Sequence, residues 1–504
     1  MSVTPTYPVA HPTWYDTIRL MFTKTDIEHM GSQGLDLTSY EQVQIASGNI
    51  YGQVAVQNMP PGNPWTADMV QTFLNWMADN CPKGTPAPDQ VSASMALFAN
   101  TAAARIRKDV NSLSATERDT LKKAFEGILA KDVSDPNSYF AQAAIHWLPT
   151  PFCQHHVPAY NPWHRAYLLG FENALRSVPG CENVTLPYWD ITTPFPDLLK
   201  SPPYDSFTLP QDIGGGFNKG YVTQRFSYPD IAANLLRYDV TADVNRALTK
   251  TDWEDFHGYW SNAPYNTIIA AHDGGHGSIG PTMSSPLVAS YDPVFWFFHS
   301  NWDRLWWQWQ TKVQATDLNG LLSTINKTTD PISYQIFTIA PLEELKPFTA
   351  GPLGLNTLKV INSVSLGVDY APPAAPPQPL AFALKTNRAV SVDRKVSLNP
   401  QRATVSVTGI NRTKIPGSFA VNLLKDGNRI ASRFLFQPDE ADKCETCVQN
   451  AMAHFDFDLP LAEVTGGKLS VEVEPVNKAI VGPRFPSKLM GNPMIDVHIP
   501  LQTN

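Results

Sequence analysis

Apolar residues recur at helical spacing through residues 60–320 of this chain. Ser114 and Glu117 have the spacing of a capping box, which marks a helix start, and apolar residues follow them at intervals of three and four. The segments 164–178 and 293–313 show the same periodicity, and the second is rich in aromatic residues. The pattern predicts a mainly α-helical domain whose helices bury their apolar sides in a common core.

Beyond residue 380 the hydrophobic period changes to two. Apolar and polar residues alternate, and Asp426-Gly427 and Gly466-Gly467 supply the tight turns of hairpins. The proline-rich stretch 371–379 precedes this change and has the composition of a stiff linker. We therefore predict an all-β, sandwich-like C-terminal domain. The predicted parts are an N-terminal extension packed on the core, a helical domain, a linker and the β-domain, at residues 1–60, 61–350, 351–385 and 386–504.

Composition and charge narrow the classes of function. The 504 residues are 43% apolar, which is enough for a sizeable core in more than one domain. The formal charge of −8 gives no electrostatic reason to bind nucleic acid or an anionic membrane, so we expect neither partner. No segment approaches the roughly 18 uncharged apolar residues of a membrane span, and the N-terminal residues do not have the pattern of a secretory leader. We therefore expect a cytoplasmic protein.

Seven of the twelve histidines are concentrated in two short stretches. The first stretch holds four of them and the second three: His146, His155, His156 and His164, then His272, His276 and His299. His272 and His276 are four residues apart, so on a helix both imidazoles project from one face and can share a metal ion. One such pair often arises by chance, but two sets of three in aromatic-rich segments do not. Imidazole sets without a nearby carboxylate ligand suit copper or zinc, and three ligands leave each ion an open position.

Longer motifs surround these histidines. They are CQHHVPAYNPWHRAYLLGFE at 153–172, HDGGH at 272–276 and DPVFWFFHSNWDRLWWQWQ at 292–310. These segments resemble the tyrosinase family of type-3 copper proteins, which includes catechol oxidases and molluscan hemocyanins. The resemblance implies a mainly α catalytic domain, a four-helix bundle around a binuclear copper site. The linker and β-domain resemble the C-terminal extension of fungal and some bacterial tyrosinases.

The resemblance also implies a role for individual residues. The first copper ion (Cu-A) would be bound by His146, His155 and His164, and the second (Cu-B) by His272, His276 and His299. Cys153 would form a thioether bond with His155, which leaves His156 outside the ligand set. Small phenols would be the substrates and O2 the co-substrate. The implied reactions are monophenol hydroxylation and o-diphenol oxidation to o-quinones, as in melanin biosynthesis, and the chain is compatible with a homo-oligomer.

Several positions depart from the family pattern. Phe298 stands where a histidine is common, and Asp273 stands where many tyrosinases have asparagine. No acidic residue lies between 260 and 271, so Asp273, together with Asn266, is the candidate group that helps to deprotonate the phenol. Val288 and Ala289, with Phe298, are expected to line the substrate pocket.

These departures leave two alternatives open. One is a catechol or o-aminophenol oxidase that does not hydroxylate monophenols. The other is a hemocyanin-like O2 carrier, which we disfavour because hemocyanin units usually occur as tandem repeats and this sequence holds one such unit.

The C-terminal domain adds two further expectations. Cys444 and Cys447 form a CxxC motif that suits copper loading, as implicated in fungal relatives, or a redox pair, or two ordinary cysteines. We favour copper loading. In the family the extension shields the copper site with an inserted side chain, for which Phe455 and Phe457 are the candidates here. The full-length protein is then expected to be latent.

Overall fold

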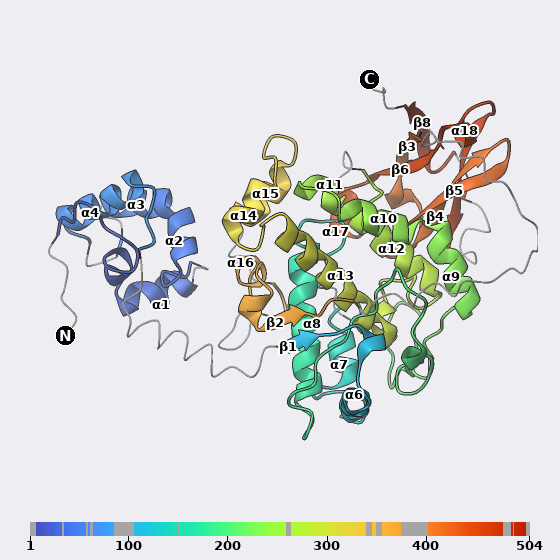
Figure 1. Cartoon of the computed structure of the whole chain (residues 1–504), viewed down its shortest axis with the longest axis horizontal. Helices are drawn as coiled ribbons and strands as arrows, with labels where there is room; N and C mark the ends of the chain where they lie inside the picture. The colour runs from blue at the N-terminus through green and yellow to red at the C-terminus, as the bar shows by residue number, and fades with distance from the viewer. Residues whose placement is uncertain are drawn as a thin grey trace, which may run out of the picture. The chain divides into compact units, whose positions relative to one another are not determined.

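The computed structural model (Figure 1) describes most of the chain. The described residues are 7–32, 35–56, 59–60, 64–84, 105–149, 152, 154–258, 264–338, 345–348, 355–373, 402–476, 485–486 and 488–499. Residues 351–354 and 374–385 of the predicted linker lie outside the described residues. Among the described helices, none is both long and apolar enough to cross a membrane.

Two compact units make up the structure. The first consists of Met1–Ala104 with Gln335–Glu344 and Asn356–Leu358, and the second of Arg105–Tyr334, Leu345–Leu355 and Lys359–Asn504. The second unit therefore contains both the histidine-rich helices and the C-terminal β-strands.

The N-terminal unit is a small helical body with its own core. Its main helices are α1 (Lys24–Ser32), α2 (Tyr40–Ile45), α3 (Ser47–Ala55) and α4 (Ala67–Ala78). Phe73 and Trp76 of α4 are fully buried in one cluster with Trp14 and Val43. The boundary predicted at residue 60 is therefore wrong, because the apolar face of α4 completes the N-terminal core. The predicted packing of residues 1–60 on the helical domain stays a prediction.

The larger unit begins with the helical region. Its longer helices are α6 (Ala115–Leu129), α8 (Tyr160–Arg176), α12 (Ile268–Ile279) and α13 (Val294–Lys312), and its shorter ones are α7 (Tyr139–Ala143), α9 (Tyr228–Arg237), α10 (Val240–Ala247), α11 (Trp253–His257) and α14 (Leu318–Ser323). The predicted capping box is confirmed: the Ser114 side chain accepts from the Glu117 amide, and the Glu117 carboxylate accepts from the Ser114 amide. The start of α6 is thus fixed by local chemistry.

Helices α8 and α13 pack against each other and are buried over most of their surfaces. The Arg165 Nε on α8 donates to the Asp303 Oδ1 on α13 at 2.6 Å, and both side chains are almost fully buried. The Tyr370 hydroxyl donates to the other Asp303 oxygen from β2 (Val368–Tyr370), a short strand parallel to β1 (Arg105–Arg107). Each oxygen of the buried Asp303 carboxylate therefore accepts a hydrogen bond, and its ion pair with Arg165 fixes the register of α8 and α13, which both carry histidines.

The C-terminal region consists of two three-stranded antiparallel sheets, in the orders β6-β3-β8 and β5-β4-β7. The strands are β3 (Arg402–Asn411), β4 (Phe419–Lys425), β5 (Asn428–Leu435), β6 (Met452–Pro460), β7 (Leu469–Pro475) and β8 (Gly491–His498). Asp426 and Gly427 both have positive φ angles, 51° and 81°, in the turn between β4 and β5. This is the conformation of a tight hairpin turn, so this predicted hairpin and the predicted all-β domain are confirmed. The hairpin predicted at Gly466-Gly467 is wrong, because these residues join the short helix α18 (Leu461–Val464) to β7, and β6 and β7 belong to different sheets.

The β-region is attached to the helices around α12 (Figure 1). Four ion pairs among the described residues join it to α9, α10 and the residues beside them: Arg237–Glu474, Arg246–Asp458, Arg433–Asp239 and Arg433–Asp243. A Cβ atom on Gly277 of α12 would collide with the Phe434 ring of β5, so the glycine permits this close approach. The end of β5 is thereby placed beside the histidine-bearing helix.

Candidate metal centre

Six histidines converge in the interior of the helical region. His164 comes from α8, His272 and His276 come from α12, and His299 comes from α13. The other two, His146 and His155, lie between α7 and α8. All six side chains are buried. Helix α12 places its two histidines on one face, as the spacing of four predicted.

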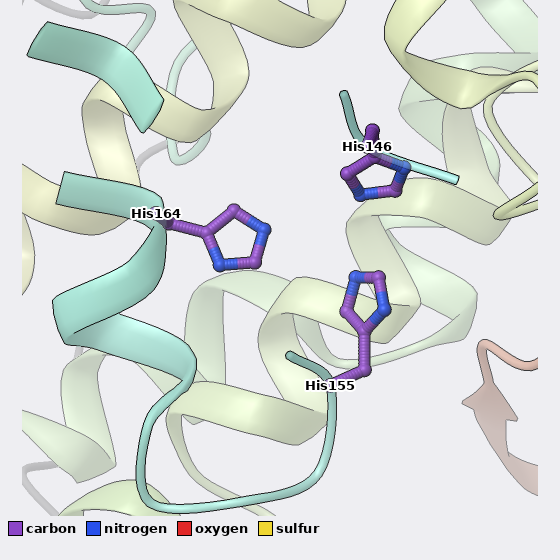
Figure 2. Close-up of side chains that lie close together, drawn as sticks. All are labelled: His146, His155 and His164. Atoms are coloured by element: carbon purple, nitrogen blue, oxygen red, sulfur yellow. The ribbon is translucent and has the colours of Figure 1, made fainter. Parts of the chain in front are cut away.

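The six residues form two triads. The ligating atoms of His146, His155 and His164 lie within 4.8 Å of one another, and their rings point toward a common centre in Figure 2. The same limit holds for His272, His276 and His299. The grouping predicted for the two metal ions is therefore the grouping that the fold produces.

The triads lie side by side and make one site. The rings of His164 and His299 are stacked with centroids 4.5 Å apart, and those of His155 and His272 are 5.7 Å apart. Two ions bound to the triads would therefore be close neighbours, as a binuclear reaction with one small molecule requires.

Hydrogen bonds on the outer side of four rings orient their inner nitrogens. Three Nδ1 atoms lie within hydrogen-bond distance of a backbone carbonyl oxygen: that of His146 is 3.1 Å from Pro286, that of His164 is 2.8 Å from Tyr160, and that of His276 is 2.7 Å from Met283. The Nδ1 of His272 is 2.9 Å from the Asp273 Oδ1. Donation from Nδ1 leaves Nε2 as the lone-pair atom that faces the site. This outer support is typical of metal-ligating histidines.

The inner nitrogens supply the test of whether a metal fits. The Nε2 atoms of His146, His272 and His276, and both ring nitrogens of His299, are buried without a hydrogen-bond partner among the described residues. Buried polar atoms left unpaired are costly, so their convergence on two points requires an explanation. Metal ions at the two triads would satisfy them, and imidazole donors suit copper.

Burial keeps these imidazoles in the form that binds metals. Loss of hydration lowers the pKa of His146 to about 3, and burial together with the neighbouring histidines lowers the pKa of His155, His164, His276 and His299 well below the usual value. The pKa of His272 is also lowered by burial, against the opposing effect of Asp273. The rings are therefore neutral at pH 7, and protons do not compete with the metal there.

Asp273 is a fully buried carboxylate beside the second triad, and both of its oxygens accept hydrogen bonds. Its oxygens accept from the Nδ1 of His272, the Nε2 of His156, the Tyr265 hydroxyl and the backbone amide of Phe436. Burial by itself would raise the pKa of Asp273, but the charges and hydrogen bonds of His156 and His272 lower it far below the usual range. Asp273 therefore orients a ligand of the second triad, and its predicted role as a proton acceptor stays a prediction.

The remaining predicted pocket residues lie in different surroundings. The Phe298 ring contacts His276 at a centroid distance of 4.7 Å and His272 at 5.8 Å, so Phe298 packs beside the second triad. Val288 and Ala289 are fully buried close to Pro286, whose carbonyl oxygen holds His146. Asn266 is buried just before α12, and its side-chain oxygen has no partner among the described residues. Their functional roles remain predictions.

The side chain that covers the histidines is Phe436, not Phe455 or Phe457. The Phe436 ring stacks on His276 at 3.9 Å with an angle of 11° between the planes, and its edge-on contacts with His155 and His272 are at 5.1 and 5.9 Å. Phe455 instead contacts Tyr265 and Phe457 lies under Arg433, both with no exposure. The prediction failed because residues two apart on a strand share one face, and on β6 that face is the domain core.

Two cysteine predictions have different outcomes. Cys444 and Cys447 are joined by a disulfide, so neither sulfur is a thiolate in this form, and copper loading would first require reduction of the bond. That role remains a prediction. Cys153, the predicted thioether partner of His155, lies outside the described residues.

The two adjoining triads, buried in helices and covered by a β-domain, define a binuclear centre of the type-3 copper class. Residues 136–224 and 216–312 match the family model for the common central domain of tyrosinase. The helical region therefore matches the tyrosinase central domain, and a C-terminal β-domain follows it, as in the fold of the Aspergillus oryzae pro-tyrosinase.

Curated relatives include hemocyanins as well as a tyrosinase. The chain is 32% identical over 259 residues to a hemocyanin of Enteroctopus dofleini, which covers 46% of this chain and 8% of that protein. It is 26% identical over 259 residues to a tyrosinase of Hahella sp. (strain CCB-MM4), covering 41% of this chain and 53% of that protein. The chain thus spans about half or less of the length of these relatives.

Solved structures confirm the fold. The tyrosinase of Burkholderia thailandensis matches with a TM-score of 0.58 at 21% identity, covering 78% of this chain and 100% of that one. The pro-tyrosinase of Aspergillus oryzae, in a mutant form, matches with a TM-score of 0.57 at 17% identity, covering 79% and 92%. At these identities the likeness is one of architecture, a helical core with a C-terminal β-domain.

Proposed function

We propose that this protein is a copper-dependent phenol oxidase of the tyrosinase type, latent while its C-terminal domain is in place. The observation that carries the proposal is the flat stacking of the Phe436 ring on His276. A phenol has the same six-membered ring, so a site that accepts Phe436 in this position has the shape for a phenol. Binding of O2 alone needs no such space.

The protein's own groups would hold and shape the reaction. The two copper ions, when bound, supply the electron transfer between phenol and O2. The oxygens of Pro286, Tyr160 and Met283 hold three of the imidazoles in orientation. Phe295, whose ring lies 4.1 Å from that of His299, helps to exclude water from the centre.

Asp273 is the candidate group that accepts a hydrogen bond from the phenol hydroxyl once Phe436 has left. One of its oxygens accepts from the Phe436 amide at 3.0 Å. Displacement of that segment removes a donor, so a lone pair of the carboxylate becomes available to a phenol hydroxyl in the vacated place. Asn266 is the second candidate for this role.

The substrates would be small phenols, with o-diphenol oxidation to o-quinones as the minimal reaction. Hydroxylation of monophenols, and with it a part in melanin formation, is the fuller proposal. A catechol or o-aminophenol oxidase is the narrower form, in which Phe298 and the other departures from the family pattern prevent hydroxylation. Parallel assays with 4-methylcatechol and tyramine separate the two.

An O2 carrier is the second candidate function. The 32% identity to the Enteroctopus dofleini hemocyanin supports it. A carrier would bind O2 reversibly and would not oxidise phenols even after Phe436 is removed.

The test replaces Phe436 by alanine in the full-length, copper-loaded chain. Loss of the stacked ring is expected to raise the rate of O2 uptake with 4-methylcatechol about tenfold, the equivalent of about 1.4 kcal/mol. Phe457→Leu is the matched control, because Phe457 lies in the core of the β-domain, and its rate should equal that of the parent protein. If Phe436→Ala instead binds O2 reversibly and consumes none of it in the presence of 4-methylcatechol, the protein is an O2 carrier.

A further inference from the structure

Arg412 connects the covering segment, the copper domain and the disulfide. It lies in η6 (Arg412–Lys414), between β3 and β4, and is 3% exposed. Its Nε donates to the Gln437 side chain at 2.9 Å, its Nη1 to the Nδ1 of His156 at 3.1 Å, and its Nη2 to the Sγ of Cys447 at 3.6 Å. One buried guanidinium thus contacts three separate segments of the chain.

The contact with His156 leads directly to the second histidine triad. His156 has a positive φ angle of 53°, and its Nε2 donates to Asp273 at 2.8 Å. Asp273 in turn accepts from the Nδ1 of His272. A continuous series of hydrogen bonds therefore runs from the Cys447 sulfur through Arg412, His156 and Asp273 to a predicted copper ligand.

The contact with Gln437 leads to the covering ring. The side-chain Nε2 of Gln437 donates to the backbone carbonyl oxygens of Arg412, Ile415 and Gly417. The backbone amide of Gln437 donates to the Ser418 hydroxyl. Gln437 is thereby fixed to η6 and the turn after it. Because Phe436 is its neighbour in the chain, the position of the covering ring depends on the same segment.

The disulfide secures α17 (Glu445–Gln449), a helix too short to be stable by itself. The Cys444 sulfur accepts from the Cys447 amide at the helix start, and the bond closes this first turn covalently. Asn450, at the other end of α17, donates to the backbone oxygen of His156 at 3.2 Å. The bonded cysteines therefore support two of the contacts on His156, one through Asn450 and one through Arg412.

The arrangement is poised to open because Arg412 is a buried cation that forms no ion pair with any carboxylate in the described part of the chain. Its hydrogen bonds within the described residues go to an amide, a neutral imidazole and a sulfur, not to a carboxylate. A buried charge of this kind regains favourable hydration when its surroundings loosen. The packing around it must therefore be held together, and the disulfide is the covalent element that does so.

We propose that the Cys444–Cys447 disulfide is a redox-controlled latch on Phe436. In reduction the S–S bond breaks and two S–H bonds form, with two electrons and two protons supplied by a dithiol that itself becomes a disulfide. Helix α17 then loses its covalent closure, Arg412 and Asn450 release His156, and Phe436 leaves His276. The inference rests on the proposed function, since it concerns the regulation of the same site. In a reducing compartment the latch would open, and in an oxidising one it would stay closed.

The first experiment reduces the full-length, copper-loaded protein with dithiothreitol, removes the reagent by gel filtration without air, and counts thiols and copper. We expect a gain of two thiols per chain, unchanged copper, and a rate of O2 uptake with 4-methylcatechol at least about fivefold higher, which reoxidation reverses. Cys181→Ala is the matched control, because Cys181 is a free buried cysteine of the helical region, and this variant should respond like the parent. A gain of two thiols with no change in rate would overturn the latch.

The second experiment makes the double variant Cys444→Ser and Cys447→Ser, loads it with copper in vitro, and measures hydrogen exchange. The amide of Phe436, protected in the parent by its bond to Asp273, should exchange at least about tenfold faster in the double variant and in the reduced parent. The rate of O2 uptake with 4-methylcatechol by the double variant, per bound copper ion, should be higher than that of the oxidised parent and should not change when reductant is added. Unchanged exchange would overturn the latch, and so would a double variant that cannot take up copper, which would establish copper loading as the role of the pair.

Phe436→Ala distinguishes failure of the latch from failure of the proposed function. If Phe436→Ala is active and reduction has no effect, the oxidase stands and the redox control falls. If neither change produces phenol oxidation in a protein that binds two copper ions, the proposed function falls.

Discussion

The histidine centre and the segment that covers it are held in place in different ways. Each of four histidines has its outer nitrogen on an oxygen atom from the helical region, mostly a backbone carbonyl close in sequence or space. Phe436 has no regular element of its own, since β5 ends at Leu435, and depends on side-chain bonds of Gln437 and Arg412. The histidines are thus held mainly by the backbone of packed helices and their flanking segments, whereas Phe436 is held by side-chain hydrogen bonds that can break without unfolding a helix.

The largest expected effect comes from removal of a predicted copper ligand. His299→Ala should lose one metal ion and lower the rate of phenol oxidation more than about a thousandfold, because several kcal/mol of metal-ion catalysis disappear. Metal content per chain and O2 uptake measure the change. His498→Ala is the control, since His498 is exposed on β8. Two bound copper ions in His299→Ala would contradict the assignment.

Loss of the buried ion pair between α8 and α13 should have the next largest effect, a loss of stability. Asp303→Asn removes the charge that pairs with Arg165 and leaves a buried guanidinium unpaired, which costs about 3–5 kcal/mol of unfolding free energy. Thermal and urea unfolding measure it. Glu126→Gln removes an exposed pair with Lys122 and should cost less than about 1 kcal/mol. Equal effects of the two variants would show that the helical region is not held by its buried pair.

The stability of the metal-free protein should depend on pH, because its histidines are buried. Their pKa values are lower in the folded state, that of His146 being about 3, so between that value and about 6.5 the unfolded chain binds more protons. Stability is therefore present above pH 6.5 and falls as the pH decreases, by about 1.4 kcal/mol per pH unit for each such histidine. Thermal unfolding between pH 7.5 and 5 tests this, and a constant melting temperature would contradict it.

The smallest expected effect belongs to the outer end of the β-domain. Gly427→Ala places a side chain at a φ of 81° in the turn between β4 and β5, where no neighbouring atom would be touched. The strain alone should cost about 1 kcal/mol of stability, with copper content and latency unchanged. A higher rate of phenol oxidation in this variant would mean that the whole β-domain, and not the segment around Phe436, controls access to the centre.

Local patterns in the sequence predicted the parts of the molecule whose geometry is local. The capping box before α6, the spacing of His272 and His276, and the hairpin at Asp426-Gly427 were all confirmed. These features depend on residues a few positions apart, for which backbone geometry allows few arrangements. The boundary at residue 60 failed, because the apolar face of α4 gives its periodicity but not its partner.

The covering residue illustrates the same limit. Phe455 and Phe457 stand out in the sequence, yet the pairing of β6 with β3 turns both into the core of the β-domain. Phe436 follows a strand in a run of apolar residues, and nothing local distinguishes it from a core residue. Its place over His276 results from the packing of β5 on α12, a contact between residues about 160 positions apart in the chain.

The sequence by itself determined the six histidines, their division into two triads, and the two kinds of domain, because spacing and periodicity set these features. Only the tertiary structure decided which ring covers the centre, that His156 supports Asp273, and that Arg412 connects both to a disulfide. The physical reason is that these contacts join segments from different elements, and their formation depends on how the elements pack and on which buried polar groups remain to be paired.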